Sequence, residues 1–309
     1  MADRLLVFGN PEVQKLLLEK FVTVAGDDWY QRRKTGDEGK FYRKVVEQGP
    51  RKGDGARQGH YVFTAQGELL GFNNNRGAER RLKMLREALE KWENLPDERK
   101  TASVAAEAKG DEENRRVLPD GGQVIKVYTR ALEKSEQGVV AAGEDEVGNQ
   151  TAVDHLWLRK EELGKLQKLI ADGGGDLPAW FSMRVARFHL RDNTRGEPED
   201  WKKEHIKSWE LKVDAKGQVS GHFEFVKKDG DLGFAGQIRG GMSFDGERLS
   251  QFDLLALGDQ WGEGTYTRGA RPGKTPLGLV LQLTEATMSR DQIPPQGIRW
   301  EQGYWQAED

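Results

Sequence analysis

A short polar segment, residues 189–197, concentrates groups that can transfer protons and bind anions. It reads His-Leu-Arg-Asp-Asn-Thr-Arg-Gly-Glu and follows an apolar helical pattern. His189 and Asp192 have the side-chain types of a general base and a general acid, and Arg195 is able to grip a carboxylate or phosphate. The alternative is a polar turn that ends the helix, because a basic group suits a helix C-terminus and Asp-Asn suits a turn.

A second segment, residues 259–274, combines glycines with cationic and aromatic side chains. Its candidate ligand-binding residues are Trp261, Tyr266, Arg268, Arg271 and Lys274, and Glu263 is a candidate catalytic acid. Glycines let the backbone approach a ligand closely, and arginine binds carboxylate or phosphate bidentately. A loop of this length and composition predicts a binding site, and the alternative is a solvent-exposed connection between strands.

Several kinds of chemistry have no residues to carry them out. The chain has no cysteine, which excludes disulfides, thiolate metal sites and a cysteine nucleophile. Its five histidines are scattered, with none three or four positions from another, so we expect no metal site. Phosphate-binding loops, the dinucleotide-binding glycine pattern and the serine nucleophile elbow are also missing from the sequence, and we expect no cofactor.

Charge and hydropathy restrict the kinds of partner. Lys plus Arg number 48 and Asp plus Glu 51 among 309 residues, giving a net charge of −3. This balance argues against nucleic-acid binding, and no apolar run is long enough to predict a membrane helix. The start Met-Ala-Asp-Arg-Leu-Leu lacks the basic and apolar regions of a signal peptide, which predicts a cytoplasmic protein. A chain trimmed of its signal would read the same.

The elements that would position the candidate residues lie in a C-terminal domain, residues 122–309. A strand is expected over 123–132, a surface loop over 135–150, and an apolar turn at Leu156 and Leu158. Two amphipathic helices are expected over 160–171 and 178–190. Beyond residue 205 the apolar residues alternate with period two between tight turns, which predicts four or five antiparallel strands in a curved sheet. The tail is expected to be pinned by its aromatic residues, Trp300, Tyr304 and Trp305.

The N-terminal part, residues 1–95, reads as helices alternating with strands, and residues 96–121 as a linker. Helices are expected over 11–20, 38–48 and 78–92, with strands at 21–25, 60–64 and 68–72. Asn10 and Pro11 supply the cap and first position of the first helix. The fold class is therefore α+β, in two domains.

The run Glu-Lys-Phe-Val-Thr-Val, the hairpin Tyr-Val-Phe-Thr-Ala-Gln-Gly-Glu-Leu-Leu-Gly and the helix that follows resemble a thioredoxin-like domain. The resemblance covers the first third of the chain and implies an α/β fold there. The family's Cys-x-x-Cys motif is absent, and Gln58 and Gly59 stand where the family has a cis-proline. The resemblance therefore implies a platform that is unable to exchange disulfides.

Three functional hypotheses follow. The preferred one is a non-catalytic protein that binds an unknown protein partner or a small anionic ligand through residues 259–274. The second is an enzyme of unknown class that joins His189 and Asp192 to Glu263 and Arg268. It requires His189 to lie within hydrogen-bond reach of one of these carboxylates. The third is an assembly or scaffold protein.

Overall fold

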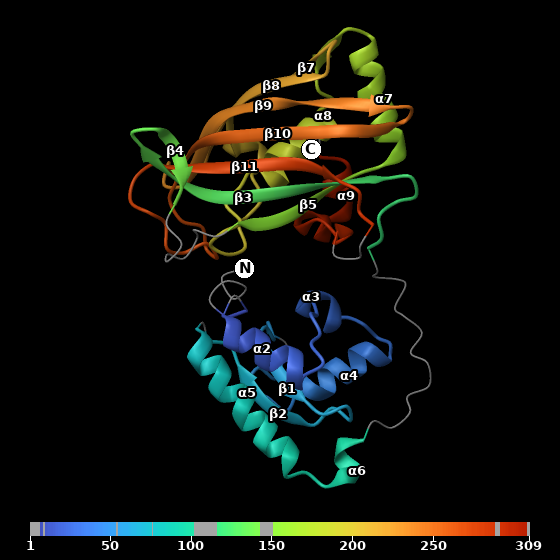
Figure 1. Cartoon of the computed structure of the whole chain (residues 1–309), viewed down its shortest axis with the longest axis vertical. Coiled ribbons are helices and arrows are strands. Elements are labelled where there is room, and N and C mark those ends of the chain that lie inside the picture. The colour runs from blue at the N-terminus through green and yellow to red at the C-terminus, as the bar shows by residue number, and fades with distance from the viewer. Residues whose placement is uncertain are drawn as a thin grey trace. The chain divides into compact units, whose positions relative to one another are not determined.

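A computed structural model describes residues 7–8, 10–53, 55–75, 77–101, 116–142, 151–287 and 291–307. The chain combines helices with antiparallel sheet and forms two compact units, residues 3–115 and 116–309. Figure 1 labels the elements of each unit. No helix within the described ranges is both long and apolar enough to cross a membrane.

The small unit is built from short helices and one hairpin. Its elements are α2 (Pro11–Lys20), α3 (Asp28–Gln31), α4 (Asp37–Val46), β1 (His60–Phe63), β2 (Leu69–Asn73), α5 (Ala78–Glu93) and α6 (Asp97–Lys100). The predicted cap of α2 is confirmed, because Asn10 Oδ1 accepts hydrogen bonds from the backbone N–H groups of Glu12 and Val13. The apolar face of α5, with Leu82 and Leu85, packs against Val13 of α2.

The strand expected over residues 21–25 is wrong. These residues have no regular secondary structure, and Val22 is 96% exposed. A β-branched run favours a strand only where a neighbouring strand and an apolar surface receive it. The described residues of this unit provide neither at this position, since β1 and β2 pair with each other.

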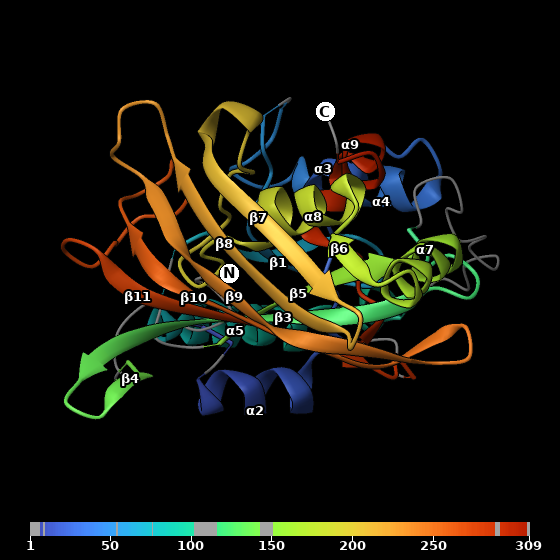
Figure 2. The ribbon, with the colours of Figure 1, turned by 90° about the horizontal axis from the view of Figure 1, so that it is seen from above.

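The large unit is a curved antiparallel sheet with helices on one face. Its strands are β3 (Gln123–Ser135), β4 (Gly138–Ala141), β5 (Ala152–Leu158), β6 (Gly174–Asp176), β7 (Ile206–Asp214), β8 (Gln218–Val226), β9 (Gly233–Asp245), β10 (Arg248–Trp261) and β11 (Thr275–Thr284). Its helices are α7 (Lys160–Ala171), α8 (Ala179–Arg184), α9 (Glu301–Trp305), the 3₁₀ turns η2 (Lys203–His205) and η4 (Gln296–Arg299), and the π-helix η1 (Val185–His189). Figure 2 shows the sheet curving past α7 and α8.

Within the described residues the sheet order is β4-β3-β11-β10-β9-β8-β7-β6, with β5 also on β3. The five strands after residue 205 alternate as predicted, and their inward residues meet α7 and α8 in one core that includes Leu166, Phe181 and Phe223. Two expectations are wrong. Leu156 and Leu158 lie in strand β5 rather than in a turn, and the loop over 135–150 begins with strand β4, while residues 143–150 lie outside the described ranges.

The tail covers the free edge of β5. Tyr304 of α9 is fully buried, and its hydroxyl accepts the backbone N–H of Trp157 on that edge. An unpaired strand edge invites pairing with another chain, so this cover protects it. The predicted pinning by aromatic residues is confirmed for Tyr304, whereas Trp300 is half exposed.

Candidate functional site

Residues 191–195 form a turn whose charged side chains are buried, and Arg195 among them holds the β10–β11 loop (residues 262–274). Arg195 donates from Nε to Asp192 Oδ2 at 2.6 Å, and from its two terminal nitrogens to the carbonyls of Thr267 at 2.9 Å and Gly262 at 3.1 Å. Asp192 also accepts from the backbone N–H and the hydroxyl of Thr194. The two predicted segments therefore meet, and Arg195 is the connection between them.

Gly196 continues this contact. A Cβ atom on Gly196 would lie 2.0 Å from the carbonyl oxygen of Tyr266, so a side chain at this position would force the two backbones apart. The glycine thus allows a close approach of one backbone to the other.

Arg271 and Glu263 also fix the loop. Arg271 donates to the carbonyls of Leu132 at 2.6 Å and Pro276 at 2.9 Å. Glu263 Oε1 accepts from the backbone N–H groups of Gly269 at 2.6 Å and Ala270 at 2.8 Å, and these bonds lower the pKa of the carboxyl group. Both side chains were expected to belong to a binding or catalytic site. Glu263 instead holds the loop's own backbone, and Arg271 ties the loop to strands β3 and β11.

The remaining candidates of the loop face solvent. Tyr266 is 67% exposed, and the Arg268 side chain is 71% exposed with a loose 3.8 Å contact to Glu263. The Lys274 ammonium lies 4.2 Å from the centre of the Trp261 ring, whose Nε1 donates to the carbonyl of Gly230. Three side chains, Tyr266, Arg268 and Lys274, are thus presented on a backbone that others hold.

His189 lies elsewhere, and the predicted grouping with Asp192 and Glu263 is not formed. Its Nδ1 is 3.2 Å from Asp154 Oδ2, and its Nε2 is 3.1 Å from the hydroxyl of Tyr304. All three side chains are buried. Asp192 is engaged by Arg195, and Glu263 by the backbone amides of Gly269 and Ala270.

The protonation of this trio follows from burial. Burial raises the pKa of Tyr304, so its hydroxyl stays protonated. The Asp154 carboxylate faces Nδ1 of His189, an arrangement that favours the tautomer with the proton on Nδ1 and leaves Nε2 to accept from the Tyr304 hydroxyl. Burial lowers the pKa of His189 against the opposing effect of Asp154. Burial alone would raise the pKa of Asp154, but the close contact with His189 and the charge of Arg191 outweigh burial and leave the pKa of Asp154 lowered.

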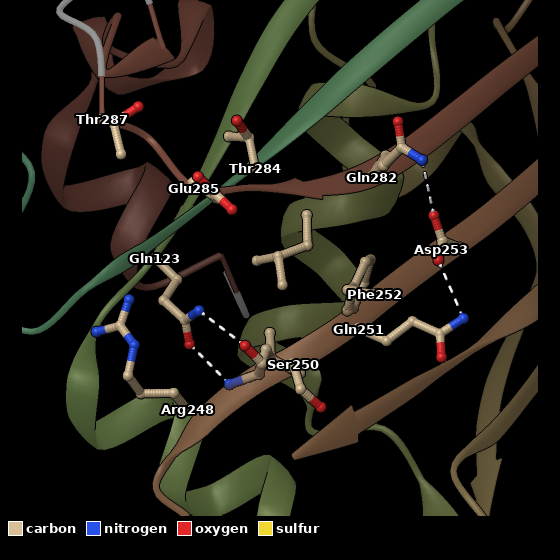
Figure 3. A pocket seen from close by; sticks show the side chains of 12 residues that line it. Gln123, Arg248, Ser250, Gln251, Phe252, Asp253, Gln282, Thr284, Glu285 and Thr287 are labelled. Atoms are coloured by element: carbon tan, nitrogen blue, oxygen red, sulfur yellow. Dashed lines mark hydrogen bonds between the residues drawn. The ribbon is translucent and has the colours of Figure 1, made fainter. Parts of the chain in front are cut away.

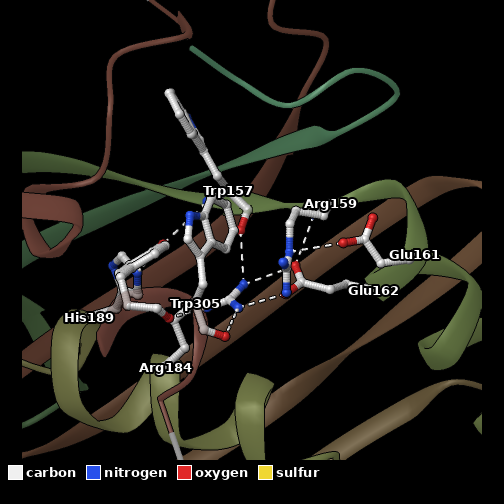
Figure 4. Close-up of polar contacts among 8 residues, drawn as sticks. Trp157, Arg159, Glu161, Glu162, Arg184, His189 and Trp305 are labelled. Carbon is white, nitrogen blue, oxygen red and sulfur yellow. Dashed lines mark hydrogen bonds and ion pairs between the residues drawn. The ribbon is translucent and has the colours of Figure 1, made fainter. Parts of the chain in front are cut away.

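A second buried ion cluster lies beside this trio and was not predicted. Glu162 accepts two hydrogen bonds from Arg184, at 2.7 and 3.0 Å, and further ones from Arg159. Arg184 also donates to the carbonyls of Trp157 and Trp305, as Figure 4 shows. The guanidinium charge outweighs burial and lowers the pKa of Glu162.

Sequence reasoning missed Asp154, Glu162 and Arg184, and it expected Tyr304 only to pin the tail. One signal was available for Asp154, because it alternates in phase with Leu156 and Leu158 and so had to point into the core. A lone carboxylate at a core position requires a partner. Asn193 is also fully buried, and its amide has no hydrogen-bond partner among the described residues.

The described residues contain no group of three or more His, Asp or Glu side chains arranged to hold a metal ion. No protein-family model matches the chain, and neither a curated protein nor a solved structure is significantly similar to it.

Proposed function

We propose that this is a non-catalytic binding protein that engages a carboxylate-bearing partner through the β10–β11 loop. The observation that supports the proposal is that some side chains hold the backbone of this loop while others are left exposed to solvent. Arg195, Arg271 and Glu263 hold the backbone, while Tyr266 and Arg268 are exposed. A loop that is ordered before binding loses less conformational freedom on binding, and Tyr and Arg are the side chains that dominate binding energy at interfaces.

Charge favours an acidic partner. Arg268 and Lys274 are exposed cations of the loop, and the carboxylate in contact with Arg268, that of Glu263, accepts hydrogen bonds from two backbone amides. An acidic partner would exchange the loose 3.8 Å contact of Arg268 for a direct pair.

The small unit is proposed to be a thioredoxin-like platform without redox chemistry, since the chain has no cysteine. The support is the order of its elements, a hairpin at 60–73 between helices α4 and α5. The missing strand at 21–25 weakens the match, because that strand was part of the resemblance.

The test uses the full chain and a fluorescein-labelled tetraglutamate peptide, with tetralysine as the opposite probe. We expect saturable binding of tetraglutamate that falls roughly tenfold in the double variant R268A/K274A and also falls in Y266A. Lys207→Ala is the matched control, because it removes one exposed cation from β7 of the same unit. Equal losses in the control, or no preference for tetraglutamate, would refute the proposal.

Comparing Arg271→Ala with Arg268→Ala separates an effect on loop folding from an effect on binding. The sequence alone predicts that both changes weaken ligand binding and leave the Tm nearly unchanged. Because Arg271 satisfies two carbonyls and is half-buried, we now expect it to lower the Tm as well, by orphaning those carbonyls. Arg268→Ala should leave the Tm unchanged.

A further inference from the structure

The sheet opens at the end of β10 and β11 that lies away from the β10–β11 loop. The ladder between these strands ends at the pair Asp253–Gln282, although β10 begins five residues earlier, at Arg248. The last residues of β11 stay with β3, down to the pair Thr284–Val124. The two strands therefore separate, and a cavity of about 570 Å³ lies between them (Figure 3).

Gln123 bridges this opening in the manner of a strand. Its side-chain amide donates to the carbonyl of Leu249 at 3.1 Å and accepts the N–H of the same residue at 2.8 Å. This pair of bonds is the one that two directly opposed residues exchange in an antiparallel ladder. The side-chain amide of Gln123 thus takes the place of a neighbouring strand's peptide group opposite Leu249 of β10.

The lining of the cleft differs between floor and rim. Leu249 and Phe252 are buried and form its apolar floor. Asp253 and Glu285 place two carboxylates at the rim, and Asp253 is oriented by the amides of Gln282 at 3.0 Å and Gln251 at 3.2 Å. Arg248 lies at the far end of the same strand segment, about 17 Å from Asp253 for an extended chain.

We propose that this cleft binds a short extended peptide that pairs with β10 between Leu249 and Asp253 and places a basic side chain beside Asp253 and Glu285. Strand addition supplies main-chain hydrogen bonds, and alternate side chains then face the apolar floor and the acidic rim. The expected ligand therefore alternates apolar residues with polar or basic ones over about five residues. The site is independent of the loop proposed above.

The probe is the fluorescein-labelled pentapeptide Thr-Val-Lys-Val-Thr with blocked ends, which reads the same in both chain directions. Its two valines can pack on the apolar floor of the cleft, and its lysine can pair with the carboxylates at the rim. We expect saturable binding to the full chain, followed by anisotropy, and slower amide exchange in residues 248–253. The same peptide with Glu in place of Lys should bind roughly tenfold more weakly.

Two comparisons make the test decisive. N-methylation of both valines removes strand N–H donors while keeping the side chains, and it should abolish binding. The variant D253N/E285Q should lose the preference for Lys over Glu, whereas Asp229→Asn, on the exposed β8–β9 turn, should keep it. Equal binding of the N-methylated peptide, a preference that survives D253N/E285Q, or no binding at concentrations on the order of 1 mM would overturn the proposal.

Discussion

Glu162→Gln tests whether the buried ion cluster holds the tail of the large unit in place. The Glu162 side chain is 1% exposed, and its carboxylate accepts five N–H groups, two from Arg184 and three from Arg159. Glutamine keeps the volume but removes the charge and turns an amide NH₂ toward two guanidinium groups. Removing one partner of a buried ion pair costs about 3–5 kcal/mol of unfolding free energy.

This loss converts to a measurable shift. A unit of this size changes its Tm by about 2–4 °C per kcal/mol, so the transition of the large unit should fall by roughly 6–20 °C in calorimetry. Glu161→Gln is the matched control, because Glu161 is the neighbouring residue, pairs with the same Arg159, and is 59% exposed. The E161Q substitution should change the free energy of unfolding by no more than about 0.5 kcal/mol.

The pH dependence has a defined sign. Because the folded-state pKa of Glu162 is lowered, its contribution is fully present above the carboxyl group's ordinary pKa and is lost as the pH falls through the lowered value. The E162Q variant should therefore lose less stability than the wild type over that acidic range. The reasoning is refuted if E162Q unfolds within about 0.5 kcal/mol of the wild type, or if E161Q is equally destabilised.

Three further changes test other parts of the structure. The lowered pKa of buried His189 means that the unfolded chain binds a proton before the folded chain does, so the stability of the wild type falls as the pH is lowered below the ordinary pKa of histidine. His189→Gln should make the free energy of unfolding less dependent on pH in that range, and an unchanged dependence in urea titrations at several pH values would contradict this. Gly196→Ala should speed amide exchange at residues 262–267, since its Cβ would meet the Tyr266 carbonyl; unaltered exchange would show that the loop tolerates it. Tyr42→Phe should destabilise the small unit by about 1–2 kcal/mol in chemical denaturation, because the Tyr42 hydroxyl donates to Asp28 at 2.7 Å. An unchanged free energy of unfolding would show that this hydrogen bond does not stabilise the unit.

The sequence predicted the elements whose periodicity is set by one continuous core. The five strands after residue 205 and helix α7 have clear patterns because each buries one face against the same cluster. It failed at β5, where Asp154 and His155 interrupt the apolar alternation, and at residues 21–25, where β-branched residues have no strand to join. Sequence patterns report the structural preference of each residue. In these two segments the secondary structure depends instead on whether another part of the chain is there to pair with them.

The same limit applied to the candidate site. The sequence found both polar segments, and Arg195 does join them. It misassigned the roles of Arg195 and Arg271, which were expected to bind an anion. The carbonyls of Thr267 and Gly262 take the donors of Arg195, and those of Leu132 and Pro276 take the donors of Arg271. Carbonyl positions depend on the folded backbone, so composition cannot distinguish an arginine that binds a ligand from one that holds a loop.

The distribution of charge between the interior and the surface separates folding from binding in the large unit. Arg184, Arg195 and Asp154 are buried, and each is committed to a partner within the chain. Burying a charge costs desolvation free energy, which a protein can tolerate where the charge fixes one arrangement of the backbone. Here the buried charges fix the tail and the β10–β11 loop. The exposed Arg268 makes a loose 3.8 Å contact to Glu263, and Asp253 of the cleft accepts hydrogen bonds from the side-chain amides of Gln251 and Gln282, so neither is paired with a buried charge. They lie at opposite ends of the β10–β11 pair, so one rigid hairpin would present two chemically opposite surfaces, a cationic loop and an acidic cleft.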